Sequence, residues 1–171
     1  DKKLKAWKLS NLPIIPPEFQ LKPITNTKKK FQQLKKQLKR KDVGEVINAC
    51  DAGREGELIF TYIYELAKTK LPIKRLWMLS MTDQAIKDAF SNMREGTDLK
   101  PLQDAARCRS ESDWLIGING TRAVTLKRSR SMSRQVSTVG RVQTPTLSLV
   151  IKREQEINSF VPCDFFRITT N

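Results

Sequence analysis

Histidine is absent from the 171 residues, and the three cysteines, Cys50, Cys108 and Cys163, lie far apart in the chain. Without histidine or a CxxC pair, we expect neither a zinc site nor a histidine general base. A sparse, odd set of thiols is typical of a reducing cytoplasm, and we expect the three cysteines to be small, partly buried apolar side chains. The chain also lacks a long apolar run, a signal-like start and a lipidation motif, so we expect no membrane partner.

Positive charge is what the chain has in excess, with 32 Lys and Arg against 18 Asp and Glu and a formal net charge of +14. Residues 1–50 carry 13 basic and 4 acidic side chains, and residues 105–141 carry 8 and 2, whereas residues 51–104 carry 8 and 9. Such charge repels itself unless a polyanion neutralises part of it, and nucleic acid is the commonest such partner. The lysine-rich helix expected over residues 27–41 could equally be a solvated face.

The apolar pattern predicts a strand, a helix and a second strand in succession. A short apolar run over residues 44–50, an apolar helix face over 55–69 and large residues over 73–79 form this unit, whose strands would be parallel. Further helices are predicted over residues 27–41, 83–93, 99–127 and 144–158, with an interruption near Gly117 and Gly120. Residues 129–140 predict a loop, and residues 160–171 could begin a strand. The fold class is α/β, followed by a mostly helical region.

Three carboxylates gather where the first predicted strand meets its helix: Asp51 at the strand end, and Glu55 and Glu57 in the first helical turn. Acids near a helix N-terminus are favourable by about 0.3–1 kcal/mol each, which explains the two glutamates but not Asp51, Gly53 or Gly56. A glycine turn that binds a bare anion is a second interpretation, although three carboxylates would repel it. The third is a Mg²⁺ ion bridging carboxylates and phosphate oxygens, which a basic chain favours.

The sequence Asp-Ala-Gly-Arg-Glu-Gly-Glu, residues 51–57, resembles the acidic motif of the Toprim fold in type IA DNA topoisomerases. Three further stretches also resemble this family. Residues 75–82 resemble the strand-to-helix connection that leaves Toprim, and residues 106–122 resemble the long helix of the domain that forms the single-strand groove. Residues 139–147 resemble the conserved motif that follows that helix. Residues 5–16 are similar to the bacterial topoisomerase III branch. The acidic motif alone is shared with primases and some nucleases, whereas the ordered set is much more specific.

The sequence departs from the family's pattern in two respects. Toprim motifs usually read Asp-x-Asp-x-Glu, but Gly53 stands at the middle acid, so the resemblance leaves Asp51 and Glu55 as Mg²⁺ ligands with Glu57 as an outer helper. The family's first strand and its nucleophilic tyrosine, in a Tyr-Pro-Arg-Thr setting, are expected before and after these residues. We therefore expect a fragment without a catalytic residue, in which Tyr62 and Tyr64 have packing or surface roles.

The resemblance also implies a set of side chains that face DNA. They are Arg54, Arg75, Arg109, Asp113, Asn119, Arg122, Thr138, Arg141 and Gln143. Several have a simpler alternative: Arg109 and Asp113 are spaced for an i, i+4 ion pair, Arg75 could form a structural salt bridge, and Arg54 could pair with Glu57. Trp114 is the one aromatic candidate for base stacking in the helical groove region, and its apolar neighbours favour a place in the core.

The domain organisation implied is the later part of Toprim over residues 1–80, the first part of a helical groove domain over 81–160, and the start of a connection to an arch domain over 161–171. The parent enzyme would cut one DNA strand through a tyrosine, pass a second strand and reseal the first. The chain alone would prefer single-stranded DNA without cleaving it, and no small-molecule substrate is expected. Alternatives are another Toprim enzyme, such as a primase or nuclease, and a non-enzymatic basic module.

Overall fold

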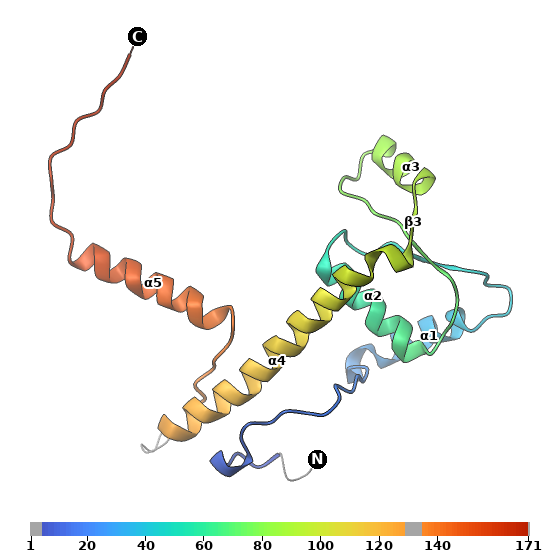
Figure 1. Ribbon diagram of the computed structural model, residues 1–171, viewed down its shortest axis with the longest axis horizontal. Coiled ribbons are helices and arrows are strands. Elements are labelled where there is room, and N and C mark those ends of the chain that lie inside the picture. The colour runs from blue at the N-terminus through green and yellow to red at the C-terminus, as the bar shows by residue number, and fades with distance from the viewer. Residues whose placement is uncertain (1–4, 129–134, 171) are drawn as a thin grey trace. The chain divides into compact units, whose positions relative to one another are not determined.

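The computed structural model describes residues 5–128 and 135–170 (Figure 1). Its contacts divide the chain into two compact units. One, the sheet unit, comprises residues 16–112. The other, the terminal unit, joins residues 1–15 to residues 113–171. The division at residue 112 falls inside a helix, and each unit is described separately below.

The sheet unit contains the strand–helix–strand motif that the apolar pattern predicts. Strand β1, Val46–Asn48, leads to helix α2, Arg54–Ala67, and then to strand β2, Ile73–Arg75. The two strands are parallel, with Val46 opposite Ile73 and Asn48 opposite Arg75. Both strands are shorter than predicted. The parallel register brings the carboxyl ends of β1 and β2 to the same edge of the sheet, which is where the acidic residues follow.

A third strand completes the sheet of the described residues in the order β1-β2-β3. Strand β3, Arg94–Glu95, pairs antiparallel with β2 and was not predicted. The 3₁₀ helix η4, Gly96–Leu99, follows it directly. A Cβ at Gly96 would lie 2.7 Å from the Cβ of Ile73, so glycine at this position permits the chain to cross closely over β2.

Two further helices belong to the sheet unit. Helix α1, Lys28–Leu38, follows the 3₁₀ helix η3, Thr25–Thr27, and contacts α2. Helix α3, Asp83–Ser91, begins after Thr82, whose hydroxyl accepts a hydrogen bond from the Ala85 amide at 3.4 Å, as expected of an N-cap. The corresponding position before α1 is Thr27, and its side chain makes no cap hydrogen bond.

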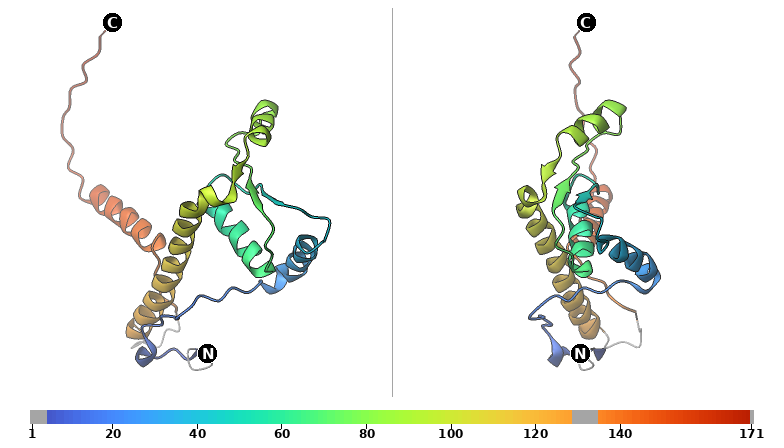
Figure 2. Two further views of the ribbon diagram at one scale, coloured as in Figure 1. Left: turned by 45° about the vertical axis from the view of Figure 1, so that its right-hand side comes forward. Right: turned by 90° about the vertical axis from the view of Figure 1, so that its right-hand side faces the viewer.

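Helix α4, Lys100–Arg128, is one continuous helix, as both views in Figure 2 show. The predicted interruption near Gly117 and Gly120 is therefore wrong. The glycines have a packing role instead: a Cβ on Gly120 would lie 2.9 Å from Cγ1 of Val139, so its absence lets the following segment lie against the helix. In sequence, a helical glycine that lets another segment pack closely against the helix looks the same as a glycine that breaks the helix.

The terminal unit holds the 3₁₀ helix η2, Leu9–Asn11, the end of α4 and helix α5, Gln143–Asn158. Residues 135–140 form no helix or strand, which agrees with the predicted loop, while the rest of that loop, residues 129–134, lies outside the described residues. Residues 160–170 contain no strand, so that expectation is wrong. No helix among the described residues is long and apolar enough to cross a membrane.

Candidate metal and nucleic-acid site

The acidic turn, residues 51–57, connects the end of β1 to the first turn of α2. Asp51, Arg54 and Glu55 are exposed, whereas Glu57 is buried. The turn reaches the helix through Gly53, the N-cap of α2, whose backbone is extended with φ 171°. The two predicted metal ligands, Asp51 and Glu55, are thus exposed, while Glu57, predicted as an outer helper, is buried beneath them.

Close backbone packing holds this turn against α2. A Cβ placed on Gly56 would lie 2.9 Å from both the backbone nitrogen and the carbonyl carbon of Asp51, and closer still to its oxygen. No side chain can occupy that space, so glycine at position 56 is required for the first helical turn to approach Asp51. A Cβ on Gly53, by contrast, meets nothing within 4 Å. Glycine is thus required by packing at position 56 but not at position 53.

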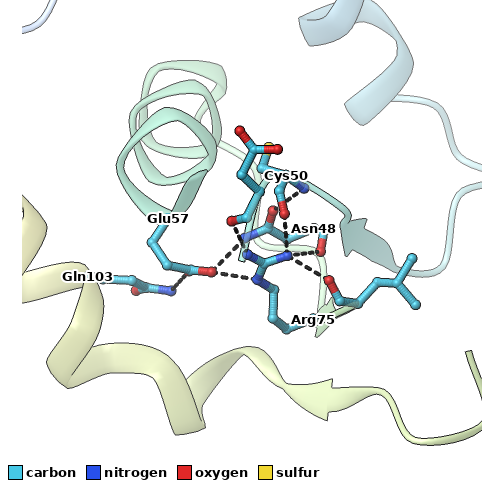
Figure 3. A network of polar contacts seen from close by, with 7 residues as sticks. Asn48, Cys50, Glu57, Arg75 and Gln103 are labelled. Atoms are coloured by element: carbon cyan, nitrogen blue, oxygen red, sulfur yellow. Dashed lines mark hydrogen bonds and ion pairs between the residues drawn. The ribbon is translucent and has the colours of Figure 1, made fainter. Parts of the chain in front are cut away.

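Beneath the turn lies a buried polar cluster, the Arg75 network, formed by Asn48, Glu57, Arg75 and Gln103 (Figure 3). The guanidinium of Arg75 contacts the Glu57 carboxylate, with Nε 2.5 Å from Oε1, and both side chains are 1% exposed. Asn48 donates to the same carboxylate oxygen at 3.3 Å, and Gln103 donates to the other at 3.2 Å. A buried charge is stable when it is paired and fully hydrogen-bonded, which is the case for this pair.

The remaining donors of Arg75 are directed at backbone carbonyls. They bind the oxygens of Asn48 at 3.0 Å, Cys50 at 2.7 Å, Leu76 at 2.6 Å and Asp51 at 2.7 Å. Its guanidinium also lies over the ring of Trp77, 4.9 Å from the centroid. The prediction that Arg75 reaches a phosphate is not supported, because the side chain is buried and its donors are engaged within the chain. The alternative, a structural salt bridge, describes it.

The surroundings of Cys50 make its thiol less acidic. Burial raises the pKa of the Cys50 thiol, while the nearby Arg75 charge partly opposes the effect. The thiol therefore remains protonated at neutral pH and is a poor nucleophile. Cys108 and Cys163 are exposed, and all three cysteines are free. The expectation that the cysteines are partly buried therefore holds for Cys50 alone.

The donor set of the acidic turn suits one kind of metal. The described residues contain no group of three His, Cys, Asp or Glu side chains able to hold a metal by themselves. Mg²⁺, however, usually binds through one or two carboxylates and completes its shell with water and substrate phosphates. Asp51 and Glu55, exposed at the carboxyl end of β1, fit that arrangement. Because position 53 is glycine and Glu57 is buried, the turn has two exposed carboxylates.

A second group of predicted residues lies in the terminal unit, around the end of α4. Asp113 forms an ion pair with Arg141, whose Nε lies 2.7 Å from Oδ1, and both side chains are partly exposed. The sequence spacing had suggested Arg109 as the partner of Asp113, and both do lie in the uninterrupted helix. Arg141 is thus oriented by a carboxylate that is 28 positions away in sequence, which spacing alone could not indicate.

Two threonines of α4 fix the segment that precedes Arg141. Thr121 exchanges hydrogen bonds with Val139: its hydroxyl accepts from the amide at 3.0 Å and donates to the carbonyl at 3.3 Å. Thr125 does the same with Ser137, at 3.0 and 3.4 Å. Each threonine hydroxyl thus satisfies both the amide and the carbonyl of one loop residue, as a neighbouring strand would. The loop of residues 137–141 is consequently held along the helix in one register.

Asn119 has a structural role rather than the predicted DNA contact. Its Oδ1 accepts from the Ile14 amide at 2.6 Å, and its Nδ2 donates to the carbonyls of Ile14 and Leu115, both at 2.9 Å. Ile14 is one of the few buried apolar residues. The side chain amide therefore holds the N-terminal segment on α4, and its donors are not directed outward.

The other predicted residues lie at or near the surface. Arg122 lies over the ring of Trp7, with Cζ 5.4 Å from the centroid. Thr138 and Gln143 are exposed, the latter as the first residue of α5. Trp114 was expected in the core but is 44% exposed. Sequence reasoning missed Asn48 and Gln103, since an amide side chain carries no pattern that distinguishes a buried partner from a surface one.

Two regions of the chain match known protein families. Residues 6–81 match the Toprim domain family, and residues 98–171 match a family described as DNA topoisomerase. Three similar relatives are all named DNA topoisomerase 3. The proteins from Bacillus licheniformis and Shouchella clausii are both 48% identical, over 96% and 98% of this chain, and that from Bacillus subtilis is 46% identical over 98%.

These alignments cover most of the chain but only a small part of each relative. The chain spans 22% of the length of each of the three proteins. The order of the two matched regions, Toprim first and then the DNA topoisomerase region, is the order of the structural elements described above. The mixed α/β sheet unit and the helical region that follows it fit both matches. The chain therefore combines a Toprim region with a DNA topoisomerase region, and over nearly its whole length it is similar to bacterial DNA topoisomerase 3.

Proposed function

We propose that this chain forms the divalent-cation site and part of the single-strand DNA groove of a topoisomerase III-like enzyme. The observation that carries the proposal is the acidic turn: two exposed carboxylates on a backbone fixed by close packing and a buried ion pair, within a chain of net charge +14. Free carboxylates on a polycation that binds DNA would weaken binding unless a cation lies between them and the phosphates.

In this proposal Asp51 and Glu55 hold Mg²⁺. The ion would neutralise phosphate charge and orient phosphate oxygens for resealing. The backbone of the turn is already held in place, because Arg75 binds the carbonyl oxygens of Cys50 and Asp51. Three free thiols are consistent with the reducing cytoplasm in which such an enzyme would work.

The proposed DNA contacts are those predicted side chains that the structure leaves at or near the surface. They are Arg54, Arg109, Asp113, Arg122, Thr138, Arg141 and Gln143. Arg141 is the most informative, because it follows a loop fixed by two threonine pairs and lies just before the first residue of α5. We further propose that residues 1–80 belong to Toprim, residues 81–160 to the groove domain and residues 161–171 to a connection toward an arch domain.

The whole enzyme's reaction is also part of the proposal. A tyrosine outside this chain would attack a phosphodiester, bonding to the 5′ phosphate and releasing the 3′ hydroxyl of the other end. A second strand would then pass. Attack by that 3′ hydroxyl on the phosphotyrosine would reseal the first strand and release the tyrosine. The relatives' name, DNA topoisomerase 3, supports this sequence of events over the primase and nuclease alternatives.

Binding to matched single- and double-stranded oligonucleotides over a range of salt concentrations tests the groove. Arg141→Ala should weaken single-strand binding and reduce the slope of log K against log salt by about 0.7 if one phosphate contact is lost. Arg153→Ala is the matched control, because Arg153 is a more exposed arginine of α5 paired with Glu156 at 3.1 Å. Equal losses in both variants would indicate charge alone and contradict the groove.

Mg²⁺ dependence separates the proposal from a non-enzymatic basic module. In the proposal, Mg²⁺ strengthens DNA binding by the native chain, and Asp51→Ala with Glu55→Ala abolishes that gain. In a module that uses charge alone, the double variant would bind DNA more tightly at every Mg²⁺ concentration, because it only removes repulsion. That second outcome would refute the metal site.

A further inference from the structure

Arg75 contacts both segments on which the proposed ligands lie, Asp51 itself on one side and the first turn of α2 on the other. Its Nη2 binds the carbonyl of Asp51, on the strand side of the turn. Its Nε binds Glu57, in the first turn of α2, where Glu55 also lies. A guanidinium is planar and rigid, so its nitrogens have fixed spacing. This rigid group therefore holds the two segments at one spacing, assisted by the Asn48 side chain, which joins the Cys50 amide to the Glu57 carboxylate.

The spacing of these two segments matters for cation binding because the motif has one carboxylate fewer than usual. Gly53 replaces the middle acid of the motif, so only two carboxylates remain to hold a cation. With fewer ligands, affinity depends more on how well the remaining ones are already placed, because each ligand ordered on binding lowers the net free energy. Both carboxylates are exposed, and the backbone of residues 51–55 is held by the packing of Gly56, by Arg75 and by the Glu57 amide, which donates to the Gly53 carbonyl at 3.1 Å.

Fold stability alone is a poor explanation for such a network. A buried ion pair is often no more stabilising than well-packed apolar residues of the same size, because both charges lose their hydration. Here four polar side chains are gathered under a turn, and three of Arg75's four backbone contacts are to the residues that lead into it, Asn48, Cys50 and Asp51. The polar atoms are placed where they fix backbone geometry.

We infer that Arg75 and Glu57 are positioning residues for the cation, fixing Asp51 and Glu55 in place of the third carboxylate that Gly53 lacks. Gln103 of α4 assists by binding the second oxygen of Glu57. This inference rests on the proposed metal site and adds the residues that determine its affinity without touching the ion.

Mn²⁺ binding to the full 171-residue chain, followed by electron paramagnetic resonance, tests it. Thermal unfolding is measured on the same samples, and affinities are compared only where each variant is folded. Arg75→Lys keeps the charge but cannot reach Glu57 and Asp51 together, and it should weaken Mn²⁺ binding about 10-fold or more, as second-sphere changes do. Gln103→Met, which removes one hydrogen bond at 3.2 Å, should weaken it less, and it carries the test if Arg75→Lys does not fold.

Two controls make the outcomes distinct. Ala106→Gly destabilises α4 at a buried position one turn from Gln103 without altering a polar group, so it should lower the unfolding temperature and leave Mn²⁺ affinity unchanged. Asp51→Asn should abolish binding. If Asp51→Asn does so but the Arg75 and Gln103 variants bind Mn²⁺ like the native chain, the positioning role is overturned while the metal site stands. If the native chain binds no Mn²⁺, the proposed metal site itself fails.

Discussion

Gly53 has an open environment, and this makes the missing acid restorable. Its backbone is extended rather than left-handed, and a Cβ there meets no atom within 4 Å. Gly53→Asp should therefore fold normally and add a third carboxylate beside Asp51 and Glu55. We expect Mn²⁺ affinity to rise about 10-fold, because each added oxygen ligand of like charge strengthens a hard-cation site. Gly53→Asn, equal in size but uncharged, is the control, and an equal gain in both variants would contradict a metal site here.

Gly56 is the opposite case, because its missing side chain is required. Gly56→Ala places a methyl group against the Asp51 backbone, which can yield only if the turn moves. We expect a loss of about 1–3 kcal/mol in the free energy of unfolding, as for other overpacked sites, together with weaker Mn²⁺ binding. Gly44→Ala, at an exposed glycine with no atom within 4 Å of the added carbon, should change neither. Urea unfolding of the two variants measures the difference.

At the scale of elements, Asn119 joins two segments that are more than a hundred residues apart. Asn119→Asp keeps the size of the side chain but removes both Nδ2 donors, leaving the carbonyls of Ile14 and Leu115 facing a carboxylate. The N-terminal segment should separate from α4 more easily, by about 1–3 kcal/mol. Hydrogen exchange at the Ile14 amide measures this. Asn26→Asp, an exposed site with the same charge change, should leave that amide's exchange rate unaltered.

The elements were largely predictable because they depend on local periodicity. Helices α1 to α5 and the parallel pair β1 and β2 each follow from an apolar pattern and a turn residue. Strand β3 was not predictable, since two residues are too few for any period. The continuity of α4 through Gly117 and Gly120 depends on the packing of Val139, which lies outside the helix.

The candidate site was predictable in its chemistry but not in its division of roles. The gathering of Asp51, Glu55 and Glu57 in one turn is visible in sequence, whereas burial of Glu57 depends on Arg75, 18 positions later. Likewise, a polar side chain such as Asn119 has the same local signal whether it binds DNA or a backbone segment. Tertiary hydrogen bonds decide such cases, and a single sequence does not encode them locally.

At the scale of the whole molecule, the chain holds no tyrosine suited to attack a phosphodiester. Tyr64 donates its hydroxyl to the Leu71 carbonyl at 2.8 Å, and burial raises the pKa of its phenol. Tyr62 lies in the same helix, under the guanidinium of Arg107, 5.8 Å from the ring centroid. We expect no relaxation of supercoiled plasmid by this chain with Mg²⁺ present. Gel electrophoresis of the plasmid checks this, and relaxation that survives Tyr62→Phe and Tyr64→Phe would point to contamination, whereas its loss in either variant would refute the assignment.

The described residues bury few apolar side chains: Ile14, Ala67, Leu76 and Ala106. Large apolar residues of α5, such as Leu149 and Val150, are mostly exposed. Heat capacity on unfolding rises with newly hydrated apolar surface, at about 12–15 cal/mol/K per residue for typical domains. A chain with so little apolar surface to uncover should fall well below that value, and its calorimetric transition should be broad and low in enthalpy. Thermal melting would then follow the loss of polar contacts more than the exposure of a core.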